Sequence, residues 1–110
     1  MAHNGTLISV GDELVTLINV FDVDASKQQD LVDLLNDGTE RVMQHRPGFV
    51  SVSILASNDG TRVVNFAQWR SLDHVKATMA DPDAGSYVRQ AGELADATPH
   101  VYTVAAVHHA

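Results

Sequence analysis

An Asn-Asp-Gly turn at residues 58–60 separates two strand-like segments and limits what this chain can fold into. Asn, Asp and Gly tolerate the positive φ that tight hairpin turns require, so the triplet favours a β-hairpin. Residues 49–57 before the turn and residues 62–69 after it are rich in β-branched and large apolar side chains, which favour strands. The two segments are therefore predicted to be neighbouring antiparallel strands.

Segments with helical patterns flank this hairpin on both sides. Ser26 and Gln29 have the spacing of a capping box, which predicts a helix from about there to residue 45. Ser71 is predicted to cap a short helix through residue 80, and a further helix is predicted over residues 84–95. Apolar residues recur at helical intervals in the first of these segments: Leu31, Leu34, Leu35, Val42 and Met43.

Two outer strands complete the predicted order β-α-β-β-α-β. Residues 14–23 form the first strand and residues 101–107 the fourth. This order is typical of a ferredoxin-like α+β fold, a four-stranded antiparallel sheet with helices on one face. The other face, with Val64 and Phe66, would be bare and apolar, so we expect a second copy to cover it in a homodimeric α/β barrel.

Length and charge set the outer bounds on organisation and partners. A chain of 110 residues is long enough for one domain, predicted over residues 13–110 behind a flexible N-terminal arm of residues 1–12. The formal charge of −7 disfavours nucleic acid and anionic membranes as partners. No cysteine is present, which excludes disulfides and thiolate metal sites. Without a signal-like or membrane-length apolar segment, we expect a soluble, cytoplasmic protein.

The strand after the turn carries an amide where apolar residues are expected. Alternate residues of a strand share a face, so Asn65 points the same way as Ala67 and Trp69. A buried amide is costly unless it has a hydrogen-bond partner. Ala67 would leave a gap on this face that a flat molecule could fill. Either the protein itself or a ligand is therefore expected to satisfy Asn65.

A second amide, Asn19, lies in the apolar first strand. In a ferredoxin-like sheet the first and third strands are neighbours, so Asn19 and Asn65 would converge beneath the helices if they share a face. Trp69 would lie about 13 Å from Asn65 along the strand. The alternative is internal: each Asn bonds nearby backbone or water, and Trp69 belongs to the core.

Three short stretches carry a resemblance to a known family. Residues 47–49 (Pro-Gly-Phe), residues 56–61 around the turn, and residues 63–69 with their Asn-x-Ala-x-Trp spacing resemble the antibiotic biosynthesis monooxygenase (ABM) family. The chain is similar to its cofactor-independent anthrone oxygenases and to the actinorhodin-type monooxygenase. The resemblance implies a homodimer that oxidises a phenolic polycycle to a quinone with O₂ and uses no metal, flavin or other cofactor.

The resemblance also implies roles for individual residues. Asn65 and Trp69 match the catalytic strand Asn and Trp of the family, and Asn19 matches the first-strand Asn of the anthrone oxygenases. Amide N–H groups suit this chemistry, because they can donate to an oxygen that becomes negatively charged as the substrate is deprotonated.

Substrate-binding positions are expected at Ala67, His74 and Arg89. Arg89 falls where the actinorhodin-type enzyme has an active-site Arg. That enzyme has a Tyr where this chain has Val75, and His74 or Tyr87 are the candidates to replace the missing hydroxyl.

Two other functions stay open at this stage. Haem-degrading monooxygenases of the same fold also pair a first-strand Asn with a strand Trp, but they need an axial His where this chain has Thr78 and Met79. A non-catalytic protein that binds a small molecule is the other alternative. The six His residues show no metal-ligand spacing, so no metal site is expected.

Overall fold

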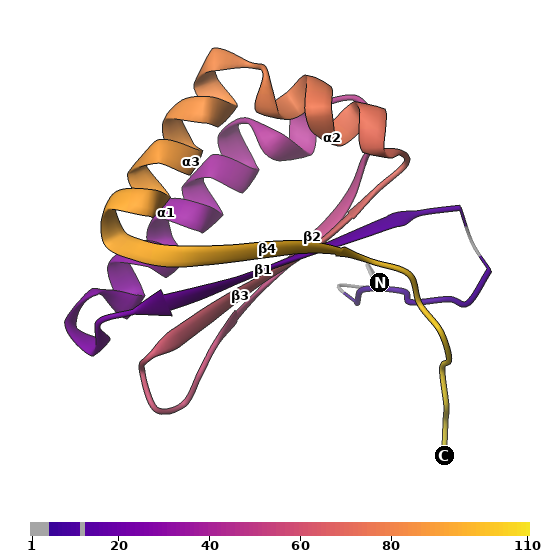
Figure 1. Ribbon diagram of the computed structural model, residues 1–110, viewed down its shortest axis with the longest axis horizontal. Helices are drawn as coiled ribbons and strands as arrows, with labels where there is room; N and C mark the ends of the chain where they lie inside the picture. Colours follow the sequence, from indigo (N-terminus) through magenta and orange to yellow (C-terminus); the bar gives the residue numbers. More distant parts are fainter. Residues whose placement is uncertain (1–4, 12) are drawn as a thin grey trace.

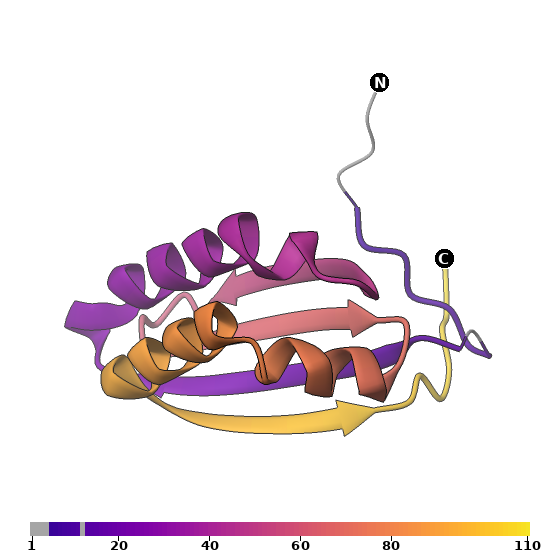
Figure 2. The same ribbon diagram turned by 90° about the horizontal axis from the view of Figure 1, so that it is seen from above.

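The computed structural model describes residues 5–11 and 13–110, which form one sheet covered by helices on one face (Figures 1 and 2). The strands are β1 (Val15–Val23), β2 (Phe49–Ala56), β3 (Arg62–Trp69) and β4 (Ala95–Tyr102), and the helices are α1 (Gln28–Arg41), α2 (Leu72–Met79) and α3 (Pro82–Leu94). The sheet is antiparallel with the order β2-β3-β1-β4. This confirms the predicted ferredoxin-like α+β fold. No helix within the described ranges is long and apolar enough to cross a membrane.

Two separate hydrophobic clusters fill the space between the sheet and the helices. The first cluster consists of Phe21, Val23, Leu31, Val63 and Ala91, with α1 and α3 above it. The second cluster consists of Ala67, Trp69 and Val75, with α2 above it. The helix-facing residues of β1 and β3 thus contribute to both clusters. The two clusters lie at opposite ends of these strands.

The hairpin and the start of α2 form as predicted. Gly60 has φ +82°, and the Asp59 carboxylate accepts hydrogen bonds from the Thr61 N–H and from the Thr61 and Ser57 hydroxyls. These bonds, led by the one from the Thr61 backbone, lower the pKa of Asp59 to about 2. Ser71 caps α2 by accepting a hydrogen bond from the His74 N–H.

Three predicted boundaries are wrong. The first helix ends at Arg41 rather than residue 45, and Met43–His45 form a separate 3₁₀ turn. The predicted capping box does not form, because Asp24 accepts from the Ser26 N–H and hydroxyl and caps a short 3₁₀ turn (Ala25–Lys27) ahead of α1. The last strand spans Ala95–Tyr102 rather than residues 101–107, and Pro99 lies inside it. Pro99 is tolerated there because β4 is an edge strand, where a missing N–H need not break a ladder bond.

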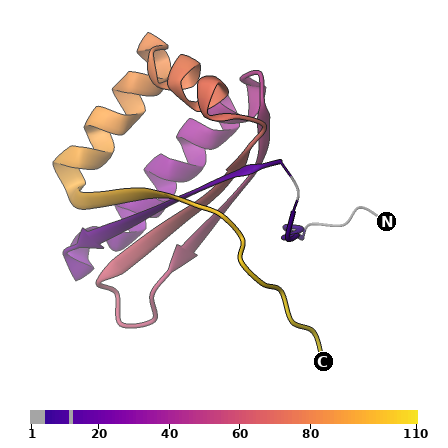
Figure 3. The same ribbon diagram turned by 45° about the vertical axis from the view of Figure 1, so that its right-hand side comes forward.

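The sheet face opposite the helices, here called the free sheet face, carries part of the N-terminal segment. The Gln68 amide donates to the Leu7 carbonyl at 2.8 Å, and the hydroxyls of Thr6 and Ser53 are 2.7 Å apart. The C-terminal segment after β4 leaves the sheet on this side (Figure 3). Residues 1–4 and 12 of the predicted arm lie outside the described residues. A second copy over the free sheet face stays a prediction.

Gly48 is expected to be irreplaceable by alanine for a steric reason. Its φ is +85°, and an added Cβ would clash with the side chain of His74. We expect Gly48→Ala to lower the free energy of unfolding by about 2–4 kcal/mol. Gly85→Ala is the matched control, since no atom lies within 4 Å of its added Cβ and α3 gains a better helix former. Urea unfolding of both variants checks this, and equal midpoints would contradict it.

Candidate active site

Asn19 and Asn65 lie directly opposite each other on the paired central strands β1 and β3. Their neighbours two residues away, such as Phe21 and Ala67, belong to the clusters beneath the helices. Both amides therefore face the helices, between the first and second clusters, as predicted. Directly opposed residues of an antiparallel pair have Cβ atoms about 4.5–5.5 Å apart, so the two amides can contact one ligand together. Asn19 and Asn65 are called the amide pair below.

The two amides lack partners for their oxygens. Oδ1 of Asn19 and Oδ1 of Asn65 are buried, and neither has a hydrogen-bond partner in the described part of the chain. Both residues are only half-buried, and their amide nitrogens are not among the buried unpartnered atoms. The nitrogens are therefore the accessible ends of the two side chains. The amide pair presents two adjacent N–H donors to whatever approaches from the helix side.

Unpartnered buried oxygens are unfavourable for stability. Each typically costs about 1–3 kcal/mol relative to a satisfied or apolar group. Asn19 and Asn65 thus weaken the sheet centre at a place where Leu or Val would pack well between the two clusters. The internal alternative, in which nearby backbone satisfies each amide, does not hold for the two oxygens. A destabilising pair of this kind is typical of a functional site.

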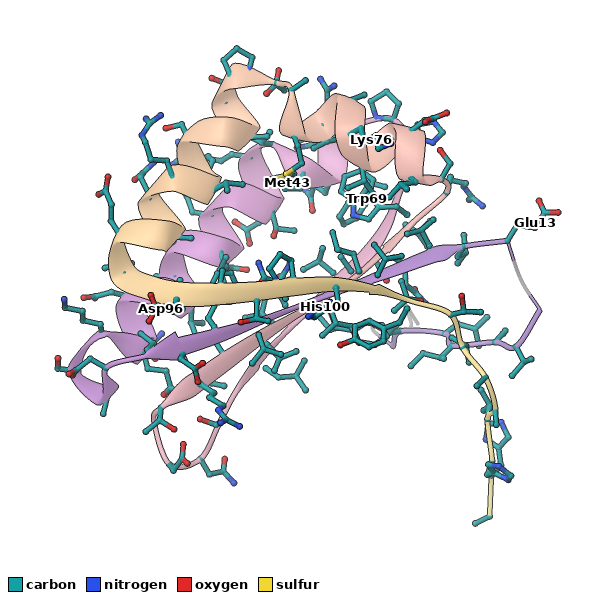
Figure 4. All side chains as sticks on the ribbon, in the orientation of Figure 1. Glu13, Met43, Trp69, Lys76, Asp96 and His100 are labelled. Atoms are coloured by element: carbon teal, nitrogen blue, oxygen red, sulfur yellow. The ribbon has the colours of Figure 1, made fainter. Side chains whose placement is uncertain are left out.

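Trp69 lies at one end of this face, between the sheet and α2 (Figure 4). Trp69 is 3% exposed, and its ring packs edge-to-face on Phe49, with ring centroids 5.5 Å apart. Ala67, between Trp69 and Asn65, is only 2% exposed and packs in the second cluster. The gap predicted at Ala67 is therefore filled by the protein itself.

His74 and Tyr87 are engaged away from the amide pair. The Nδ1 atom of His74 lies 2.7 Å from the Ser71 hydroxyl at the start of α2, and its ring covers Gly48. Tyr87 donates a hydrogen bond of 2.7 Å to Asp37 of α1, which lowers the pKa of Asp37 and raises that of Tyr87. Neither residue supplies the hydroxyl that is missing at Val75, which is buried in the second cluster.

Arg89 lies on the solvent side of α3. It is exposed, whereas Ala84 and Ala91 on the inward side of the helix are buried. A surface hollow of about 330 Å³ between α1 and α3 is lined by neither Arg89 nor the amides; its lining residues are Arg41, Val42, Asp83, Ser86, Tyr87 and Gln90. The structure therefore brings together Asn19 and Asn65, with Trp69 further along β3, but not Arg89 or His74.

Thr78 is a polar residue of this region that sequence reasoning did not select. Its side chain is fully buried on the inward face of α2, one turn after Val75, and its hydroxyl has no partner among the described residues. A helical Thr ordinarily bonds its own backbone, so the sequence carries no signal for this. Haem degradation would need a His at Thr78 or Met79. The described residues contain no group of three His, Asp or Glu side chains suited to a metal ion.

Comparisons with known proteins point to one family. Residues 14–90 match the antibiotic biosynthesis monooxygenase family. Tetracenomycin-F1 monooxygenase of Streptomyces glaucescens is 49% identical over 75 residues, which are 68% of this chain and 67% of that protein.

Solved structures agree with this match. A monooxygenase from the gene ActVA-Orf6 of Streptomyces coelicolor, in complex with nanaomycin D, has a TM-score of 0.77 and 28% identity, over 87% of this chain and 91% of that chain. SnoaB, a cofactor-independent oxygenase from Streptomyces nogalater, has a TM-score of 0.71 over 87% of this chain and 97% of its own. At 21% identity, SnoaB supports the fold alone. The family match spans the amide pair and Trp69, and the chain belongs to the antibiotic biosynthesis monooxygenase family.

Proposed function

We propose that this protein is a cofactor-independent monooxygenase that oxidises a phenolic polycycle of the anthrone or hydroquinone type to a quinone with O₂. The observation that carries the proposal is the amide pair, two neighbouring N–H donors beside buried, unpartnered oxygens. The names of the tetracenomycin-F1 monooxygenase and of the Streptomyces coelicolor monooxygenase support the reaction class.

The chemistry needs no cofactor because an anthrone can supply the electrons itself. Loss of a C–H proton gives a delocalised anion whose charge lies largely on oxygen. This anion gives one electron to O₂, and the resulting substrate radical and superoxide combine to a peroxide, which is protonated. Loss of water leaves a new C=O group, so one oxygen atom enters the product and the other leaves as water.

The amide pair acts on the first step of this sequence. The Nδ2 groups of Asn19 and Asn65 donate hydrogen bonds to the substrate oxygen as negative charge develops on it. When substrate is bound, its rings together with the apolar clusters on both sides of the pair exclude water, which slows reprotonation of the anion. A homodimer through the free sheet face and a cytoplasmic location complete the proposal.

Oxygen consumption with a simple anthrone tests the proposal. Purified protein, stripped of metal by chelation and free of flavin, is mixed with dithranol (1,8-dihydroxyanthrone) in an oxygen electrode while quinone absorbance is followed. We expect one O₂ consumed per quinone formed, and one labelled oxygen atom in the product from ¹⁸O₂. A rate equal to that of buffer would reject the oxygenase.

The same material separates the two alternatives. Binding of dithranol without oxygen consumption would favour a non-catalytic binding protein. Haem titration tests haem degradation. A shifted, saturable Soret band followed by loss of haem would favour haem degradation over the proposed oxidation of an anthrone.

A further inference from the structure

We propose that the substrate reaches the amide pair over β4, through an apolar mouth that holds its non-reacting rings. The apolar mouth is formed by four half-exposed side chains: Leu72, Met79, Val88 and Val101. This inference rests on the proposed function, because it assigns the binding region of the same substrate.

The flank of α2 that carries Leu72 and Met79 faces away from β2. On the other flank, His74 covers Gly48, and the Arg46 guanidinium donates to the Ala77 carbonyl at 3.4 Å. Residues seven apart share a helix face, so Leu72 and Met79 lie together, on the side toward β4. They are 43% and 42% exposed, whereas Val75 between them is buried.

Val88 occupies the corresponding flank of α3. Tyr87 packs on Gly38 of α1, where an added Cβ would lie 2.9 Å from the Tyr87 ring. Ala84 and Ala91, four residues before and three after Val88, are buried against the core. Val88 therefore lies beside the inward face on the side away from α1, above β4, and is 51% exposed. Figure 2 shows α2 and α3 on the β4 side of the helix layer and α1 on the β2 side.

Val101 completes the mouth from below. It pairs with Leu17, which packs against the second cluster, so Val101 shares the helix-facing side of the sheet. It is 55% exposed, and Pro99, which pairs with Asn19, is exposed as well. The helix-facing side of β4 thus lies open next to the amide pair. His100, one residue between them, points the other way (Figure 4).

The dimensions and the chemistry of this region fit a flat phenolic ligand. Two strand spacings, about 10 Å, separate β4 from Asn65 on β3, which suits a tricyclic ring system lying across β1. An apolar protein surface would cover the mouth but leave both amides without acceptors. A phenolic polycycle covers the mouth with its rings and offers an oxygen to the amide pair.

Substitutions at the mouth test this assignment. Val88→Asp and Val101→Asp place a charge where rings would lie, and Val88→Leu keeps the surface apolar. Gln90→Asp adds the same charge to an exposed position of α3 and serves as the matched control. Binding is measured by titration with 1,8-dihydroxyanthraquinone, and turnover with dithranol.

We expect both mouth Asp variants to raise Kd for the anthraquinone and KM for dithranol by about tenfold or more, with kcat changed less than about threefold. Val88→Leu and Gln90→Asp should match the wild type. The binding assignment would be rejected if Val88→Asp and Gln90→Asp changed Kd and KM equally. It would also be rejected if neither mouth Asp variant changed them. Dissociation of an oligomer by Val88→Asp with ligand binding unchanged would reject it as well. If neither the wild type nor any variant oxidises dithranol but the mouth Asp variants still weaken anthraquinone binding, the proposed oxygenase activity is rejected. The assignment of the apolar mouth as the binding region is then retained.

Discussion

Replacing Asn65 with leucine is expected to lower kcat for anthrone oxidation by about 10²–10³-fold and to leave the protein at least as stable as the wild type. The loss follows from removing one of two N–H donors aimed at a developing oxyanion. The stability follows from removing a buried Oδ1 that has no partner between two apolar clusters. A residue kept only for packing would not show this opposite pair of effects.

Steady-state kinetics and urea unfolding of the same preparations measure the two effects. Asn36→Leu removes an exposed amide from α1 and should change neither quantity much. Asn19→Leu should repeat the pattern of Asn65→Leu. The double variant should lose less than the product of the single losses, because the two donors bind one oxygen. An Asn65→Leu enzyme that keeps its kcat would show that the amide is not part of the machinery.

The centre of the sheet could be predicted from the sequence because its signals are local and agree with each other. The Asn-Asp-Gly turn fixes the partner of β3, and the two-residue period of strands fixes the face of Asn65 and Trp69. Once the first and third strands are neighbours, only the register between Asn19 and Asn65 remains open, and the structure pairs them directly.

The edges and the helix layer were less predictable. β4 is an edge strand exposed along most of its length, so its residues carry no buried alternation, and Pro99 suggested a boundary where there is none. Ahead of α1, Asp24 and Ser26 both suit a cap, and Asp24 caps the 3₁₀ turn Ala25–Lys27 while its carboxylate accepts the Ser26 hydroxyl. The edge position of β4 depends on strand pairing that sequence spacing does not encode.

The position of the expected site residue Arg89 on α3 was unpredictable for a related reason. The resemblance predicts Arg89 at the substrate, yet the rotation of α3, with Tyr87 packed on Gly38, turns Arg89 toward solvent. The same rotation brings Val88 above β4. Sequence alone fixes which residues share a helix face, but the face that turns inward depends on the neighbouring helix.

Trp69→Ala is expected to lower the free energy of unfolding by about 3–5 kcal/mol, because Trp69 is 3% exposed and supports both Phe49 and Val75. A small domain has only about 5–15 kcal/mol in total, so this variant would be marginal at 37 °C. Urea unfolding at 10–15 °C would measure the loss. A loss below about 1 kcal/mol would mean that the second cluster does not depend on this ring.

The large structural effect of Trp69→Ala means that its lost activity would say nothing about catalysis, so Trp69→Phe is the informative variant. Phe keeps an aromatic ring against Phe49 and should cost about 1–2 kcal/mol, but it lacks the indole N–H. If the indole contacts the substrate, kcat/KM for dithranol falls by tenfold or more in Trp69→Phe while its fold is retained. A tenfold fall corresponds to a loss of about 1.4 kcal/mol of transition-state binding. If Trp69 acts only in the core, Trp69→Phe keeps its kcat/KM and the amide pair alone contacts the reacting oxygen.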